Sequence, residues 1–163
     1  MCIRDSGDAV PQHLRRRRGH RHLDVLGGQL DRWLREVMWP REARLTPEDV
    51  EVAMTAASAE MLRHGVTTSV EMYFHPERIA AAVRASGARA VVANPLIGLP
   101  GFGTFDEQLE TAVRLSGESD DQVEYGIGPH SAYTVPLPVL TAAAEGARAH
   151  DLLLTVHLSL IHI

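Results

Sequence analysis

Apolar and β-branched residues gather in four short runs after residue 65, and segments with helical spacing separate these runs. A segment of seven or eight residues that is rich in such side chains and bounded by Gly, Pro or polar residues is typical of a strand in a parallel sheet. In the segments between the runs, apolar residues recur three and four positions apart, as one face of a helix requires. We therefore predict four strands, over residues 66–73, 90–97, 122–128 and 152–159.

The predicted helices begin and end at residues that favour helix termini. Thr46 is expected to cap a helix that runs to about residue 64 and ends at Gly65. Earlier in the chain, apolar spacing from residue 29 predicts a helix that Pro40 stops or kinks. The remaining helices are predicted over residues 76–86, 105–115 and 138–150. These strand–helix steps, each of about 25–35 residues, indicate an α/β protein with a parallel sheet, either open or closed into a barrel.

The last predicted strand, LLLTVHLS at residues 152–159, contains His157 near its end. We expect this strand to be buried on both faces, because its apolar run is nearly continuous. The carboxyl end of a parallel strand is where α/β folds place their chemistry. The alternative is a core or loop histidine with a backbone partner.

Length and composition indicate one ordinary domain. The chain has 163 residues, of which 45% are hydrophobic and 23% charged. Cys2 is the single cysteine, so disulfides within the chain and cysteine-based zinc sites are excluded. No apolar run approaches the length of a membrane span, and we expect a cytoplasmic protein with no membrane partner. All sixteen basic residues are Arg, which excludes a Schiff-base lysine within this chain.

The two ends of the chain differ from the rest. Residues 1–22 contain six Arg and two Asp, a balance of +4, so the remaining residues carry −9 of the net charge of −5. This acidic body argues against a nucleic-acid partner, although the Arg run at 15–18 could be a solvated tail or a nucleic-acid-binding arm. The ends MCIRDS and LSLIHI resemble translated adapter sequence. We therefore interpret residues 1–28 as irregular or artefactual, 29–159 as the domain and 160–163 as an artefactual tail.

Histidines at three places could carry chemistry. His130 follows the third predicted strand, and His157 ends the fourth. His20 and His22 form a His-x-His pair, which on an extended segment presents two imidazoles to one metal ion. A third imidazole and a carboxylate would complete a zinc site with room for water. The alternatives are coincidence for the pair beside the Arg run and a loop position for His130.

Four motifs occur in order along residues 29–159: LREVMWPREARLTPED from residue 34, GVTTSVEMYF from 65, GPHSAYT from 128 and TVHLS from 155. As a set they resemble the amidohydrolase superfamily. Within it they are most similar to deaminases of S-adenosylhomocysteine, methylthioadenosine and related purines, and to neighbouring chlorohydrolases. The resemblance implies a partial (β/α)8 TIM barrel of the metal-dependent hydrolase type, covering roughly the first five βα steps. It also implies hydrolytic deamination of a purine nucleoside-type or related heterocyclic substrate, with water and one zinc ion per site.

The resemblance also assigns roles to individual residues. His157 matches the fifth-strand metal ligand, and His20 and His22 match the metal-binding pair, although in an altered context. His130 and Glu42 match substrate-binding positions. The glutamate that shuttles protons in the family would stand three residues after His157, where this chain has Leu160. The chain therefore contains no assigned catalytic residue, and we expect it to be an inactive fragment when alone.

Other functions remain open. One alternative is a catalytically inactive barrel fragment or binding module, because an incomplete barrel leaves strand edges that favour pairing with another chain, including a homo-oligomer. Another is a relative that acts on pyrimidines or triazines.

Overall fold

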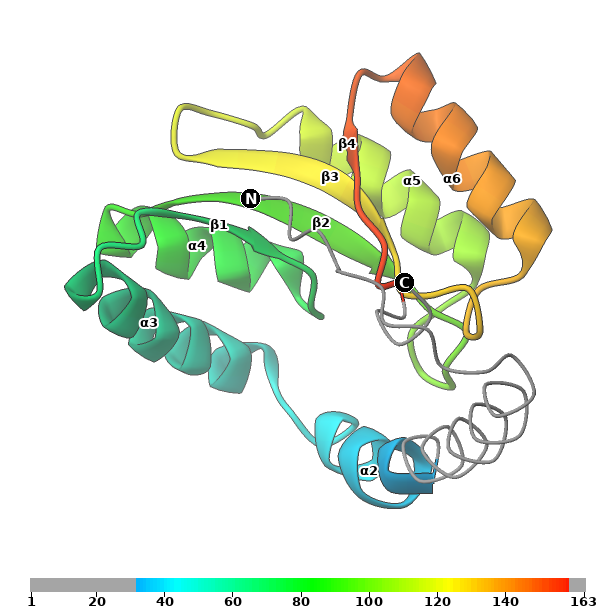
Figure 1. Cartoon of the computed structure of the whole chain (residues 1–163), viewed down its shortest axis with the longest axis horizontal. Coiled ribbons are helices and arrows are strands. Elements are labelled where there is room, and N and C mark those ends of the chain that lie inside the picture. Colours follow the sequence, from blue (N-terminus) through cyan, green and yellow to red (C-terminus); the bar gives the residue numbers. More distant parts are fainter. Residues whose placement is uncertain (1–31, 159–163) are drawn as a thin grey trace, which may run out of the picture. The chain divides into compact units, whose positions relative to one another are not determined.

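The computed structural model describes residues 32–158 (Figure 1). The chain divides into two units, one of residues up to Arg44 and one from Leu45 onward. In the second unit four strands form one sheet in the order β1-β2-β3-β4, and every neighbouring pair is parallel. The strands are β1 (Thr68–Glu71), β2 (Arg89–Leu96), β3 (Val123–Pro129) and β4 (Leu153–Leu154). The predicted α/β class is confirmed.

The helices of the second unit begin and end within one or two residues of the predicted bounds. Thr46 caps α3 through a reciprocal capping box: its hydroxyl accepts from the Asp49 N–H, and the Asp49 carboxylate accepts from the Thr46 N–H. Thr104 and Glu107 form the same box at the start of α5. The helices are α3 (Pro47–Arg63), α4 (Pro76–Ser86), α5 (Phe105–Ser116) and α6 (Leu137–Ala149).

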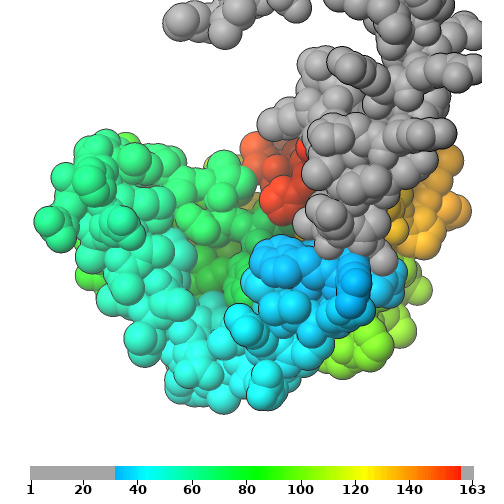
Figure 2. All heavy atoms as spheres, turned by 60° about the horizontal axis from the view of Figure 1, so that its bottom comes forward, coloured from blue at the N-terminus to red at the C-terminus, as the bar shows by residue number. Residues whose placement is uncertain are grey.

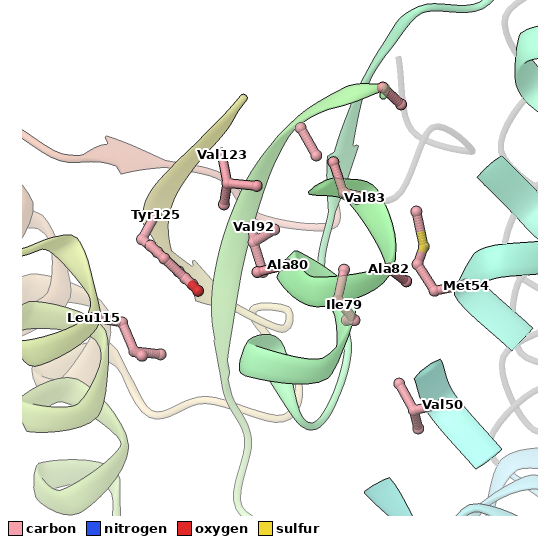
Figure 3. Packing of buried hydrophobic residues seen from close by; sticks show 12 residues of the cluster. Val50, Met54, Ile79, Ala80, Ala82, Val83, Val92, Leu115, Val123 and Tyr125 are labelled. Carbon is pink, nitrogen blue, oxygen red and sulfur yellow. The ribbon is translucent and has the colours of Figure 1, made fainter. Parts of the chain in front are cut away.

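The two central strands, β2 and β3, place most of their buried apolar side chains on the face that the helices cover. Val92 of β2 is in register with Tyr125 of β3, and both belong to a buried cluster with residues of α3, α4 and α5. Figure 3 shows Met54 of α3 pointing toward Ala82 of α4. Leu96 packs with residues of α5 and α6 in a second cluster on this face. A parallel sheet with sequential strand order and helices on one face is the arrangement found in βα barrels.

On the opposite face of the sheet, glycine residues lie where a neighbouring strand or side chain approaches β3 closely. A Cβ at Gly126 would lie 2.8 Å from the Leu153 carbonyl oxygen, and one at Gly128 would lie 2.9 Å from Cγ of Met72. Glycine at both positions therefore lets β4 and the Met72 side chain approach β3.

The prediction of a long strand at 152–159, buried on both faces, is wrong for the described residues. β4 contains only two residues, and Leu153 and Leu154 are 40% and 41% exposed. Figure 2 shows the red end of the described chain at the surface. Within residues 32–158 β4 pairs with β3 alone, so its second edge has no strand to cover it. A continuous apolar run predicts burial only if both neighbouring layers are present.

The register between β3 and the segment after β4 shifts by one residue. Ile127 pairs with Leu154, and this register would pair His130 with His157. The next bridge instead joins Ser131 to His157, so the β3 side carries one additional residue, as in a β-bulge.

In the first unit the helix passes through Pro40 rather than stopping there. A π-helical turn, η1 (Leu34–Met38), leads into α2 (Trp39–Glu42). Pro40 has no N–H, and its ring would clash with the carbonyl four residues back in a regular α-helix. The wider turn, in which the Trp39 N–H donates to the Leu34 carbonyl, accommodates the ring. No helix within residues 32–158 is long and apolar enough to cross a membrane.

Candidate metal and substrate site

His130 and His157 lie side by side at the carboxyl ends of neighbouring parallel strands. His130 directly follows β3, and His157 lies three residues after β4. The backbone N–H of His157 donates to the His130 carbonyl at 3.1 Å. Their ring centroids are 5.3 Å apart, with the ring planes at 80°. The sequence places both histidines at strand ends, and the structure brings them into contact.

The His130 ring is held from one side by two hydroxyl groups. Its Nδ1 lies 2.9 Å from Oγ1 of Thr134 and 3.3 Å from Oγ of Ser131. Its backbone N–H donates to the Leu96 carbonyl at 3.0 Å. Partial burial lowers the pKa of His130, and the neighbouring charge of His157 lowers it further. His130 is therefore neutral at neutral pH.

His157 is the predicted metal ligand that the structure describes, but the described residues do not complete a site. Its side chain is exposed, and a neutral imidazole is a suitable zinc ligand. Within residues 32–158, no group of three His, Cys, Asp or Glu side chains is close enough to hold a metal ion. The other two predicted ligands, His20 and His22, and the position of Leu160 lie outside the described residues.

Glu42 is the last residue of α2 and belongs to the first unit. Its side chain is partly buried. The two histidines belong to the second unit, so the predicted contact of Glu42 with the same substrate stays a prediction.

A cavity of about 200 Å³ lies beside the loops that follow β1 and β2. Phe74 and Phe102 line it, and their rings are stacked with centroids 4.0 Å apart. Neither His130 nor His157 lines this cavity. Its buried polar side chains Asn94 and Gln108 are already hydrogen-bonded to the chain. We therefore regard the cavity as separate from the histidine pair.

Sequence reasoning missed the two hydroxyls beside His130. Ser131 and Thr134 stand one and four residues after the histidine, in the GPHSAYT motif. Their contact with Nδ1 depends on a turn in which the Thr134 N–H donates to the Ser131 carbonyl at 3.2 Å. A hydroxyl residue four positions after a strand-end histidine was the available signal.

The four strands are parallel and follow their order in the sequence, and helices cover one face of the sheet. This arrangement is that of a segment of a βα barrel, and the two histidines lie at the strand ends where such barrels place their active sites. The sequence profile of the amidohydrolase family matches residues 13–162, and the chain belongs to this family. The predicted resemblance is thus confirmed.

Several of the similar proteins have the names of deaminases. The chain is 34% identical to a 5-methylthioadenosine/S-adenosylhomocysteine deaminase of Thermococcus kodakarensis over 149 residues, 86% of this chain and 35% of the relative. It is 34% identical to a 5'-deoxyadenosine deaminase of Methanothermobacter thermautotrophicus over 134 residues, 80% of this chain and 31% of the relative. A crystal structure of an adenosine deaminase from Xanthomonas campestris with bound zinc superposes with a TM-score of 0.73 at 32% identity, covering 78% of this chain and 30% of the other.

The chain spans about a third of the length of these relatives. The structural match confirms the predicted fold, a TIM barrel of which this chain forms a part. The resemblance implies roughly five βα steps, and the described residues contain four strands; residues 1–31 lie outside the described residues.

Proposed function

We propose that this chain is part of a zinc-dependent deaminase that hydrolyses the C–N bond of an amino group on a purine nucleoside-type or related heterocycle. The observation that carries the proposal is the contact between His130 and His157 at two adjacent strand ends. The names of the similar proteins support the substrate class, since they act on adenosine derivatives. We also infer a cytoplasmic location, because the chain has a single cysteine and cytosolic proteins rarely contain disulfides.

The residues proposed to hold the metal are His157, His20 and His22. The exposed imidazole of His157 fits this role, and a nitrogen donor set suits zinc. When bound, zinc would supply a water molecule with a lowered pKa for attack on the ring carbon that bears the amino group.

Two other residues are proposed to bind the substrate. His130 is neutral and partly buried, so it can hydrogen-bond a polar atom of the heterocycle beside the metal site. Glu42 is proposed to accept hydrogen bonds from ribose hydroxyl groups. The position of the proton-relay glutamate is Leu160 in this chain. We therefore expect the 163-residue chain with zinc to deaminate neither adenosine nor methylthioadenosine.

A zinc titration of the purified chain, followed by calorimetry, tests the metal site. We expect about one zinc ion per chain, and His157→Ala should weaken binding by at least tenfold. His150→Ala is the matched control, because His150 is exposed at the end of α6 and should not affect binding. A double His20→Ala, His22→Ala variant should lose affinity as His157→Ala does. Unchanged affinity in His157→Ala would overturn the proposed metal site.

A second candidate function is a non-catalytic chain that associates with another copy or another protein. Apolar side chains that the sheet leaves open favour it: Val70 is 56% exposed, and Leu153 is 40% exposed. Sedimentation velocity distinguishes the two, because a concentration-dependent oligomer without zinc affinity would support this second candidate.

A further inference from the structure

We propose that Ser131 and Thr134 form a hydroxyl relay that positions His130 and holds its ring in the tautomer with the hydrogen on Nε2. This makes His130 a hydrogen-bond donor and prevents Nε2 from binding a metal ion. The use of that donor on a substrate rests on the proposed function, whereas the tautomer itself does not.

The loop after β3 places the two hydroxyls on the Nδ1 side of the ring. The N–H groups of Thr134 and Val135 both donate to the Ser131 carbonyl, at 3.2 and 3.0 Å. This turn brings Oγ1 of Thr134 to 2.9 Å from Nδ1 and to 2.7 Å from Oγ of Ser131. Ser131 is 1% exposed, so its hydroxyl must find its partners within the chain.

The hydrogen atoms can be assigned from these distances. If Ser131 Oγ–H donates to Thr134 Oγ1 and Thr134 Oγ1–H donates to Nδ1, the two shortest contacts form one continuous chain of donors. Both hydroxyl hydrogens are then paired, and Nδ1 is an acceptor without a hydrogen. In a neutral imidazole the hydrogen must then lie on Nε2.

The opposite tautomer uses poorer geometry. If Nδ1 donated to Thr134 Oγ1, either hydroxyl could donate in the 2.7 Å contact between Ser131 and Thr134. With Ser131 as the donor, the Thr134 hydrogen has only the Ser131 carbonyl, at 3.4 Å, which is near the limit of a hydrogen bond. With Thr134 as the donor, the buried Ser131 hydrogen faces only Nδ1, at 3.3 Å, which already carries a hydrogen in this tautomer. The relay that ends at Nδ1 therefore accounts for the contacts better.

The relay gives the two neighbouring histidines different tasks. A nitrogen that carries a hydrogen has no lone pair for a metal, so Nε2 of His130 can only donate. His157, whose exposed ring lies 5.3 Å away, remains available as the ligand. A polar ring nitrogen or hydroxyl of a substrate is the kind of acceptor that His130 would recognise. Ser131 and Thr134 act through His130 and are positioning residues.

Nitrogen NMR of the histidine side chains in the metal-free 163-residue chain tests this proposal at neutral pH. In the wild-type chain, His130 should show a hydrogen-free Nδ1 and a hydrogen-bearing Nε2. The double variant Ser131→Ala, Thr134→Val should move both signals toward the average of a tautomer mixture. Thr134→Ser keeps the hydroxyl and should retain the wild-type signals. Thr141→Val, which removes an exposed hydroxyl in α6 that donates to its own helix, is the control and should change nothing.

The nitrogen signals of His130 show whether Ser131 and Thr134 set its tautomer or only stabilise the loop. A hydrogen on Nδ1 in the wild-type chain would overturn the proposal, as would unchanged His130 signals in the double variant. Thermal melts of each variant show whether it folds, and Thr134→Val alone provides a milder variant if the double one does not. Zinc added to the wild-type chain should shift the signals of His157 and not the Nε2 signal of His130. If zinc binding fails while the tautomer is as proposed, the proposed function fails and the relay stands.

Discussion

The side-chain amide of Gln108 pairs with both backbone groups of Ile97. The Ile97 N–H donates to Oε1 at 2.8 Å, and Nε2 donates to the Ile97 carbonyl at 3.1 Å. The same Nε2 also donates to the Phe102 carbonyl at 2.9 Å. Gln108 of α5 thereby takes the place of a neighbouring strand for the residue that follows β2. These hydrogen bonds fix both ends of the loop between β2 and α5 to α5 itself.

Replacement of Gln108 by Met should destabilise the chain by about 2–3 kcal/mol, because it leaves buried backbone groups of the loop without partners at nearly constant volume. Urea unfolding followed by circular dichroism measures this change. Gln122→Met is the matched control, since within the described residues Gln122 makes one side-chain donation, to the Ala88 carbonyl at 3.3 Å, from a less buried position. Equal losses in the two variants would contradict the role given to Gln108.

Ser58 should be replaceable by Ala at no cost. Its side chain is fully buried in α3, and its Oγ has no hydrogen-bond partner among the described residues. A buried hydroxyl without a partner is unfavourable, so Ser58→Ala is expected to leave the free energy of unfolding unchanged or raise it by up to about 1 kcal/mol.

Ser86→Ala provides the comparison for Ser58→Ala. The Ser86 hydroxyl donates to the Val83 carbonyl at 2.7 Å and accepts from the Ala88 N–H at 3.2 Å. Its loss should cost about 0.5–1.5 kcal/mol in the same unfolding experiment. If Ser58→Ala were as destabilising as Ser86→Ala, the Ser58 hydroxyl would have a partner that the structure does not show.

The sequence predicts the helices well because their signals are local. Thr46 and Thr104 meet their capping partners three residues along the chain, so each box can be read from the sequence. The burial of β4 could not be predicted in this way, because it depends on which elements lie beside the strand. The contact of His130 with His157 follows from parallel strands having their carboxyl ends at one edge. The relay to Thr134 depends on a turn with no strong sequence signal.

Gly126→Ala should displace β4 from β3. The added Cβ would meet the Leu153 carbonyl oxygen at 2.8 Å, and a backbone atom of a paired strand cannot move without breaking the ladder. We expect a loss of stability of about 1–3 kcal/mol, as for other overpacked sites, together with weaker zinc binding through His157. Unfolding and zinc titration measure the two effects.

Gly128→Ala is the control for Gly126→Ala. The nearest atoms to its added Cβ are Cγ of Met72, at 2.9 Å, and Cβ of Ala93, at 3.2 Å. Met72 is a flexible side chain that can change rotamer, so the loss of stability should be smaller and zinc affinity should be retained. A greater effect on zinc affinity from Gly128→Ala than from Gly126→Ala would contradict this explanation.

The stability of the metal-free chain should fall as the pH drops below about 6.5, because the folded state holds His130 neutral. Burial and the neighbouring His157 lower the pKa of His130 from the ordinary value of 6.5. As the pH falls through 6.5, an unfolded histidine binds a proton while folded His130 does not, so protons favour the unfolded state. The free energy of unfolding stops falling once the pH is below the pKa of His130 in the folded state. The slope of the free energy of unfolding against pH is at most about 1.4 kcal/mol per pH unit.

His130→Asn should flatten this dependence between pH 7.5 and 5.5, as measured by urea unfolding at several pH values. His64→Asn, at the exposed end of α3, should keep the wild-type slope. The carboxylates give a separate effect at lower pH: hydrogen bonds from Thr46 lower the pKa of Asp49, and those from Thr104 lower the pKa of Glu107. Their stabilisation is lost only as the pH falls below their ordinary values of 3.8 and 4.5. An unchanged slope between pH 7.5 and 5.5 in His130→Asn would show that another group causes the loss.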